Sequence, residues 1–198
     1  MIRSRSISCL LSITLIWSAI ACANPSSFSA LRALSPRQSN SATDYLVASA
    51  IYTNSENNSA FQCWEFKAPL NVSAGAGTVG AETFTFFDLA NLTYTHIPPR
   101  FAGGVHNSPA PQIVMILSGL AQVTLPHGSE TLWAIGGGTN GLFFAVDSVG
   151  TGHNTTYPSD EESNLIQIPF SGGMKSIPPH KVLHEGPCDE KNGQVVSS

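Results

Sequence analysis

The sequence is poor in charge and has no cluster of basic residues. Only 11% of its 198 residues are charged, and nine Lys and Arg against thirteen Asp and Glu give a formal net charge of −4. Proteins that bind nucleic acids or anionic membrane surfaces gather Lys and Arg in one region. The sequence therefore argues against both kinds of partner.

The N-terminal segment has the three parts of a secretory signal peptide. Two arginines precede an apolar run over residues 7–22, and a small-x-small cleavage site ends at Ala23. The run is too short for a comfortable bilayer span, so no stable membrane anchor is expected. We expect residues 1–23 to be removed and the chain to follow the secretory pathway, to the extracellular space or the vacuole lumen.

Cysteine is also scarce, with four residues in the whole chain. Removal of the N-terminal segment leaves only Cys63 and Cys188. In an oxidising compartment two remaining cysteines favour a disulfide. We predict that this bond ties the C-terminal tail to the body of the protein, with two unpaired buried thiols as the alternative.

Four sequons of the form Asn-x-Ser/Thr have no intervening proline. The predicted glycosylation sites are Asn57, Asn71, Asn91 and Asn154. Glycans there would supply solubility that a charge-poor surface lacks. The sequons indicate a eukaryotic secretory or vacuolar glycoprotein.

Helix signals are few, whereas short runs rich in Val, Ile, Thr, Phe and Tyr recur between clusters of Gly, Pro, Asn and Ser. Such runs predict an all-β chain, with a sandwich or a jelly-roll barrel as its architecture. We assign residues 24–43 to an N-terminal arm, 44–172 to the β domain and 173–198 to an irregular C-terminal tail. The expected strands lie at 45–52 and 61–66, then within 82–89, 113–125, 131–135, 141–146 and 164–170.

The stretch GAGTVG at residues 75–80 has the letters of a dinucleotide-binding fingerprint. That fingerprint works only between a strand and a helix, whose N-terminus binds the pyrophosphate. Here a strand-like run follows, so we predict a flexible loop and no nucleotide site.

The stretch HNSPAPQIVMILSG, residues 106–119, places polar side chains at the start of an apolar strand. Pro109 and Pro111 exclude a helix and a regular central strand, so the strand begins at Gln112. If the backbone before it is roughly extended, His106, Ser108 and Gln112 point into the same apolar interior. Polar groups there are costly unless they are satisfied. A ligand or metal is one explanation, and a core histidine held by a backbone carbonyl is the other.

A second histidine follows a glycine-containing turn. Neighbouring residues of a strand point to opposite faces, so an outward glycan on Asn154 implies that His153 points inward. Two inward histidines and an inward amide from distant parts of the chain have the composition of a metal site in a small barrel.

These residues resemble the first cupin motif, G-x5-H-x-H-x3,4-E-x6-G. His106 takes the place of the first histidine, Ser108 replaces the second, Gln112 replaces the glutamate and Gly119 matches the closing glycine. Arg100 occupies the position of the opening glycine. Two of the motif's ligand positions are thus changed.

The second cupin motif, P-x-G-x2-H-x3-N, is matched by Gly150 and His153, while Ser148 and Tyr157 replace its proline and asparagine. The H-x-S-P-x-x-Q form of the first motif and the D-x-x-G-x-G-H form of residues 147–153 resemble a subgroup of small single-domain cupins. Secreted fungal members of this kind are similar to the cupin dioxygenases of polyketide pathways such as the patulin pathway.

The resemblance implies a cupin double-stranded β-helix, or jelly-roll barrel, with a divalent metal held by His106, Gln112 and His153. Iron, manganese or copper is preferred over zinc, and neutral glutamine would leave the metal its full charge and open positions. The implied function is a metal-dependent oxygenase that acts on a small apolar, phenolic or polyketide-type metabolite. Ser108 would hydrogen-bond the substrate or a metal-bound water, and the expected pocket lining is Val114, Ile116, Phe143 and Phe144 or their neighbours.

Two other functions fit the same residues. His106 and His153 are able to act without metal as the acid and base of an isomerase, dehydratase or cyclase. A non-enzymatic cupin that only binds a small molecule is the other alternative, since fold does not fix function. The resemblance also allows a homodimer.

Overall fold

The structure is a computed structural model that describes residues 43–189 and 195–197. All of these described residues belong to one compact unit. The expected signal peptide and nearly all of the expected N-terminal arm lie outside the described residues. No helix in the described part of the chain is long and apolar enough to cross a membrane.

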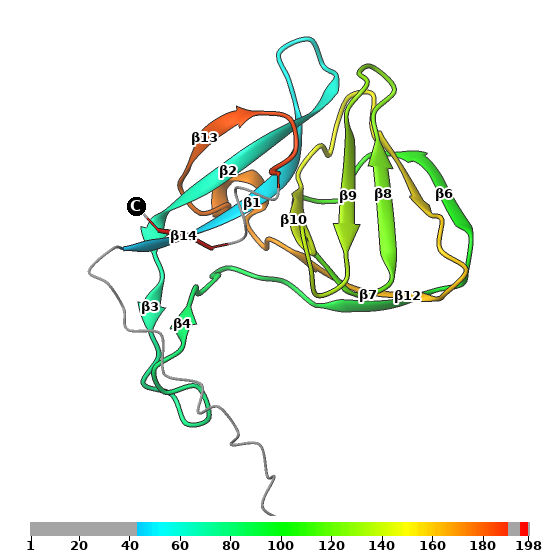
Figure 1. The fold of residues 1–198 in the computed structure, drawn as a ribbon. Coiled ribbons are helices and arrows are strands. Elements are labelled where there is room, and N and C mark those ends of the chain that lie inside the picture. The colour runs from blue at the N-terminus through cyan, green and yellow to red at the C-terminus, as the bar shows by residue number, and fades with distance from the viewer. Residues whose placement is uncertain (1–42, 190–194, 198) are drawn as a thin grey trace, which may run out of the picture. The chain divides into compact units, whose positions relative to one another are not determined.

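Eight consecutive strands form two facing sheets (Figure 1). One sheet has the order β10-β7-β12-β5 and the other the order β6-β11-β8-β9. Every strand pair within these two orders is antiparallel. The strands are β5 (Thr93–Ile97), β6 (Phe101–His106), β7 (Gln112–Ser118), β8 (Leu120–Thr124), β9 (Thr131–Ile135), β10 (Leu142–Ala145), β11 (His153–Tyr157) and β12 (Ser163–Pro169).

This strand order is that of a jelly roll. The eight strands β5–β12 are numbered here from one to eight in chain order. One sheet then has the spatial order 6-3-8-1, and the facing sheet has the order 2-7-4-5. Jelly rolls of eight strands include the cupins. The prediction of an all-β chain with a jelly-roll fold is confirmed.

A hairpin of β1 (Asp44–Thr53) and β2 (Ser59–Pro69) extends the larger sheet beyond β10. β1 runs parallel to β10 and antiparallel to β2. A small separate hairpin of β3 (Asn71–Val72) and β4 (Glu82–Thr83) encloses residues 75–80, which form turns. The expectation of a loop at these residues is confirmed.

The C-terminal segment is more regular than the sequence predicted. After a single 3-10 turn at Gly173–Ser176, β13 (His180–Glu185) pairs with β2, and β14 (Val195–Ser197) pairs with β1. The prediction of an irregular tail is wrong for these residues. The imidazole of His180 stacks on the indole of Trp64 with ring centroids 3.8 Å apart, which helps to hold β13 against the sheet.

The Cys63–Cys188 disulfide is present, as predicted. Both cysteines are buried. The backbone N–H of Cys188 donates to Ser49 Oγ at 2.7 Å, and its carbonyl accepts from Asn140 Nδ2 at 3.1 Å. The segment that follows β13 is thus fixed to β1 and β2 by a covalent bond and by buried hydrogen bonds.

Two apolar clusters pack on opposite faces of the larger sheet, which explains why β7 is apolar on both sides. Val114 and Ile116 belong to the cluster between the two sheets of the jelly roll. Ile113 belongs to the cluster on the other face, to which β1, β2 and the segment that follows β4 also contribute side chains. Phe143 and Phe144 divide in the same way, because neighbours on a strand face opposite sides.

The four predicted glycosylation sites differ in exposure. Asn57, Asn71 and Asn91 are exposed, whereas Asn154 is half-buried on β11 and donates from Nδ2 to Thr124 Oγ1 at 3.3 Å. Glycosylation of these residues stays a prediction.

Candidate functional site

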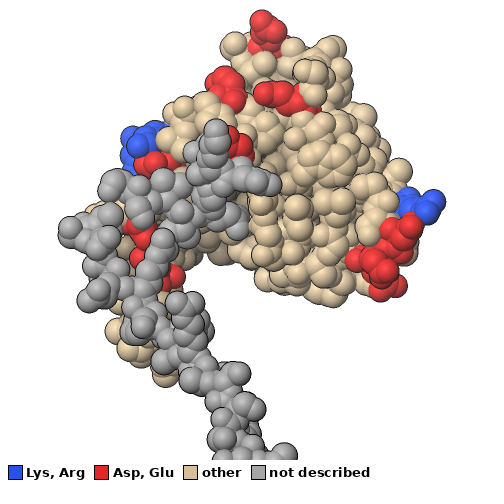
Figure 2. Space-filling view, viewed as in Figure 1, with Lys and Arg blue, Asp and Glu red and all other residues tan. Residues whose placement is uncertain are grey.

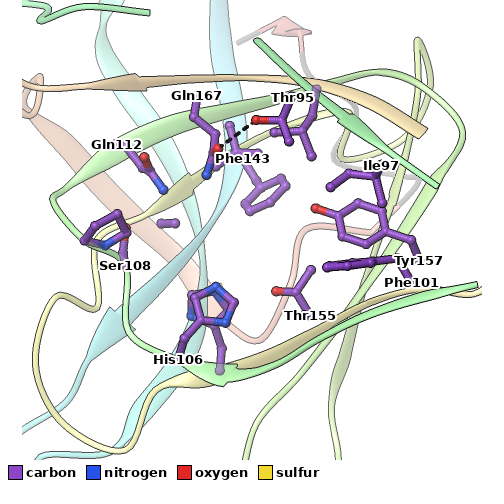
Figure 3. A pocket seen from close by; sticks show the side chains of 16 residues that line it. Thr95, Ile97, Phe101, His106, Ser108, Gln112, Phe143, Thr155, Tyr157 and Gln167 are labelled. Atoms are coloured by element: carbon purple, nitrogen blue, oxygen red, sulfur yellow. Dashed lines mark hydrogen bonds between the residues drawn. The ribbon is translucent and has the colours of Figure 1, made fainter. Parts of the chain in front are cut away.

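A cavity of about 390 Å³ lies between the two sheets of the jelly roll (Figure 3). Sixteen residues line it, and none of them is Lys, Arg, Asp or Glu. Apolar groups supply one part of the wall: Ile97, Phe101, Pro109, Val114, Phe143, Ala145 and Leu165. Polar groups supply most of the rest: Thr95, His106, Ser108, Gln112, His153, Thr155, Tyr157 and Gln167. All four predicted site residues therefore border one cavity.

His153 is the most buried histidine of the cavity, with 4% of its surface exposed. Its Nδ1 lies 2.8 Å from Oδ2 of Asp147, which is completely buried. An ionised carboxylate only accepts hydrogen bonds, so the proton lies on Nδ1 and Nε2 carries the lone pair. The burial of His153 in the cavity wall agrees with the prediction that its side chain points inward.

Asp147 is held in turn by the β1–β2 hairpin. Ser59 Oγ donates to the same Oδ2 at 2.7 Å, and Asn107 Nδ2 donates to the backbone carbonyl of Asp147 at 2.9 Å. Oδ1 of Asp147 has no hydrogen-bond partner among the described residues. The buried carboxylate therefore uses one of its two oxygens to hold the His153 ring in place.

His106 lies directly opposite His153, because these two residues are paired across β6 and β11. Their ring centroids are 4.6 Å apart. His106 is exposed at the end of its strand, and its Nδ1 lies 3.0 Å from the carbonyl of Gly104. Since a carbonyl only accepts, Nδ1 of His106 also carries the proton and Nε2 the lone pair.

A glycine turn fixes this pairing. Gly152 has a φ of +72°, and a Cβ on it would lie 2.7 Å from the carbonyl oxygen of His106. Nearby, Ser59 N donates to Thr151 Oγ1 at 2.9 Å. Glycine is thus required where the turn before His153 approaches the end of β6.

Ser108 and Gln112 both line the cavity, but only Ser108 has a hydrogen-bond partner within the protein for its side chain. The Ser108 hydroxyl donates to the Ala110 carbonyl at 2.6 Å, so it stabilises the turn before β7. Gln112 is 4% exposed, and among the described residues no protein group bonds its carboxamide. Its amide nitrogen is directed toward the cavity (Figure 3).

Gln167 and Tyr157 also line the cavity, although no chemistry was assigned to them from the sequence. Thr95 Oγ1 donates to Gln167 Oε1 at 3.5 Å, which leaves the amide nitrogen of Gln167 directed into the cavity (Figure 3). Burial raises the pKa of Tyr157 to about 12, so its hydroxyl is a neutral donor near neutral pH. Both side chains were detectable as polar residues at even spacing along inward strand faces, with Tyr157 four residues after His153.

The predicted pocket wall is partly correct. Val114 and Phe143 line the cavity, whereas Ile116 is covered in the core and Phe144 faces the opposite cluster. The Asp147 contact with His153 was also missed, although its signal was available. Asp147 precedes the glycine turn by a few residues, and such a turn brings its two ends together.

The two histidines are arranged as metal ligands usually are, whereas Gln112, the third predicted ligand, directs its amide nitrogen toward the cavity. Metal-binding histidines usually donate the N–H that faces away from the metal to a carboxylate or a carbonyl, as both histidines do here. In the described part of the chain, no group of three His, Cys, Asp or Glu could hold a metal ion. Gln112 would have to turn its carboxamide to present Oε1.

The chain matches no protein-family model and no curated protein. It is similar to a solved protein of unknown function from Streptococcus pyogenes, with 23% identity and a TM-score of 0.31 over 42% of this chain and 65% of that one. It is also similar to the cupin domain of Schizosaccharomyces pombe Cnp3, with 14% identity and a TM-score of 0.32 over 63% of this chain and 81% of that one. Because both scores are low, the fold assignment rests on the strand order.

Proposed function

We propose that this chain is an enzyme that moves a proton on a small, largely apolar metabolite, as an isomerase, dehydratase or cyclase does. The observation that carries the proposal is the buried Asp147–His153 pair, which presents a lone pair to a cavity without charged lining residues. An imidazole in this state is a general base near neutral pH.

Four polar side chains have distinct parts in the reaction. His153 Nε2 accepts the proton from the substrate, and Asp147 orients the ring and stabilises the imidazolium that forms. His106, whose ring lies 4.6 Å away, is placed to exchange a proton with a second substrate atom. Tyr157 supplies a neutral O–H to a substrate oxygen.

The cavity composition supports an uncharged aromatic or polyketide-type substrate. Phe101, Phe143 and Leu165 offer apolar surface, and the carboxamides, hydroxyls and imidazoles offer hydrogen bonds without a full charge. Ligand sites commonly combine a mostly apolar wall with a few placed polar groups. Secondary-metabolite biosynthesis within the secretory pathway is the setting that we propose for this activity.

A metal-dependent oxygenase is the second candidate, and the Nδ1 hydrogen bonds of both histidines favour it. His106, His153 and a turned Gln112 would hold the ion, with iron, manganese or copper preferred over zinc. The bound metal would supply activation of dioxygen. The first candidate ranks higher because a carboxylate ligand is missing and the Gln112 nitrogen is directed toward the cavity (Figure 3).

Deuterium incorporation together with metal analysis tests this proposal. In D2O, the purified full chain should exchange the methyl protons of 2,4-dihydroxyacetophenone, observed by proton NMR, and His153→Gln should abolish the exchange. Elemental analysis should find metal well below one equivalent, and dialysis against a chelator should leave the exchange rate unchanged.

Stoichiometric iron, manganese or copper, with activity lost on chelation, would transfer the assignment to the oxygenase. Binding of the ketone without any exchange would instead support a non-enzymatic small-molecule carrier.

A further inference from the structure

Two carboxamides in the cavity have no role in the proton transfer described above. Gln112 begins β7 and Gln167 lies on the adjacent strand β12. Gln112 is paired with Pro169 and Gln167 with Val114, so the two glutamines are diagonal neighbours on the face that lines the cavity. Diagonal neighbours are separated by roughly 7–8 Å, within reach of long side chains.

Both carboxamides act as hydrogen-bond donors toward the cavity. Thr95 donates to Oε1 of Gln167, so the oxygen of that amide is already used and its nitrogen is directed inward. Gln112 is 4% exposed and has no protein partner within the described residues, and its nitrogen also points toward the cavity (Figure 3). Because the Gln112 amide faces the cavity and no protein group accepts from it, a ligand oxygen at this place would accept its hydrogen bond.

We infer that Gln112 and Gln167 together form the oxygen-binding site for the substrate's carbonyl group and for the enolate that forms from it. This inference rests on the proposed proton transfer, and it narrows the substrate class to enolisable carbonyl compounds. Preorganised N–H donors that face a developing oxyanion in a cavity shielded from water commonly make a large contribution to catalysis.

The step is balanced without an oxidant or a reductant. The C–H bond next to the carbonyl breaks, and its proton goes to Nε2 of His153. The electron pair of that bond forms a C=C bond, while the π pair of the carbonyl becomes the charge on the oxygen that Gln112 and Gln167 bind. In a β,γ-unsaturated substrate, return of the proton to the γ-carbon gives the conjugated isomer. In a β-hydroxy substrate, the hydroxide that leaves takes the proton from His153 and departs as water, which gives the dehydrated product.

A matched pair of probes measures oxyanion binding separately from turnover. 4-Nitrophenolate mimics an enolate, and 4-nitroanisole is its uncharged methyl ether. Isothermal titration calorimetry on the full chain at a pH that ionises the phenol should show at least tenfold tighter binding of the phenolate. A hydrogen bond to a charged group is worth about a factor of ten or more.

Gln112→Leu and Gln167→Leu should each weaken phenolate binding about tenfold and change ether binding less than twofold. Gln122→Leu is the matched control, because Gln122 lies on β8 and accepts from Thr156 Oγ1 at 3.2 Å, apart from the cavity lining. It should leave both affinities unchanged. Retained ether binding shows that each variant is folded.

Two results would overturn the inference. One is equal affinity of the wild-type protein for phenolate and ether, and the other is unchanged phenolate binding in both cavity variants. Failure of the proposed proton transfer is read separately: without deuterium exchange but with the predicted phenolate preference, the oxygen-binding site stands and the base assignment fails. If deuterium exchange survives both glutamine substitutions and the protein shows no phenolate preference, the base assignment stands and the oxygen-binding site fails.

Discussion

At the scale of single residues, the site depends on one carboxylate that is buried before any ligand arrives. Asp147 Oδ2 receives donors from Ser59 and His153, while Oδ1 has no partner among the described residues. Such an arrangement costs free energy in the resting protein, because a buried polar atom without a partner is destabilising. Its cost is explained if the charge of Asp147 serves to orient His153 and to stabilise positive charge on it.

Replacing Asp147 tests this role. Asp147→Asn keeps the shape of the side chain and removes its charge, so we expect deuterium exchange to slow by up to about 10⁴-fold, as the same change of the orienting carboxylate does in a Ser-His-Asp triad. The measurement is the exchange rate by NMR, with circular dichroism as the check on folding. Asp160→Asn, at an exposed ion pair with Arg100, is the control and should keep the full rate. An Asp147→Asn protein with an unaltered rate would contradict the assignment.

Tyr157 gives a prediction about pH. Burial raises its pKa to about 12, whereas the unfolded chain should ionise near 10. Its contribution to the free energy of unfolding is fully present below pH 10 and is lost as the pH rises toward 12, by roughly 2–3 kcal/mol. Denaturant unfolding of wild type and Tyr157→Phe across pH 9–12 measures this, and the wild type should lose more stability than the variant. Parallel curves would show that the phenol is not buried in this way.

At the scale of elements, the strands set which side chains meet. The pairing of His106 with His153 across β6 and β11 places both rings side by side. Alternation along a strand was enough to predict that His153 faces inward, because it depends only on local backbone geometry. His106 borders the same cavity, but residues 107–111 between it and β7 do not form a strand, so alternation does not account for its position. The Asp147–His153 contact was not predicted. The glycine turn indicates that its two ends lie close, but the β1–β2 hairpin, which supplies Ser59, also holds the Asp147 carboxylate, and that contact has no local sequence signal.

The turn before His153 can be tested through its glycine. Gly152→Ala should cost about 1 kcal/mol for the positive φ, and more because its Cβ would lie 2.7 Å from the carbonyl oxygen of His106. We expect slower deuterium exchange as the two histidines separate. Gly137→Ala is a matched control, since Gly137 has a φ of +69° and no atom within 4 Å of an added Cβ.

Chemical denaturation measures the cost of each glycine substitution. Gly137→Ala should show only the penalty for positive φ and the full exchange rate. If Gly152→Ala behaved in the same way as Gly137→Ala, the close approach of the turn to β6 would not matter for the site.

The strand pattern was predictable from sequence to the extent that side-chain alternation and turn residues specify it. Most strands of the jelly roll lie at the expected runs, including β7, β9 and β10. β13 was not predicted, because prolines bracket residues 180–185 and the strand forms through its pairing with β2. Pairing between distant segments has no local sequence signal, and the parallel contact of β1 with β10 is of the same kind.

At the scale of the whole molecule, one disulfide, Cys63–Cys188, links distant segments of the described part of this charge-poor chain. Surface over β8 and β9 consists mainly of uncharged residues (Figure 2), and Trp133 and Ile135 are more than 40% exposed there. A homodimer or glycans would each cover such a surface, and both stay predictions. The disulfide is compatible with the predicted secretory route, which stays a prediction.

The disulfide should contribute strongly to stability, because it joins residues 125 positions apart. Replacing both partners, Cys63→Ser and Cys188→Ser, should lower the free energy of unfolding by about 3–5 kcal/mol. Guanidinium denaturation measures the loss, and hydrogen exchange should show the amides of β13 losing protection first. An unchanged denaturation midpoint would mean that pairing with β2 alone holds the C-terminal segment.

The protonation state of the His153 ring tests the central claim most directly. In ¹⁵N-labelled protein, two-bond correlations from the ring carbon protons report which nitrogen carries hydrogen. We predict that neutral His153 is protonated at Nδ1, with a strongly downfield proton shared with Asp147, and that Asp147→Asn removes this signal. Protonation at Nε2 in the wild-type protein would contradict the account, because the cavity would then face a donor where the proposed reaction requires a base.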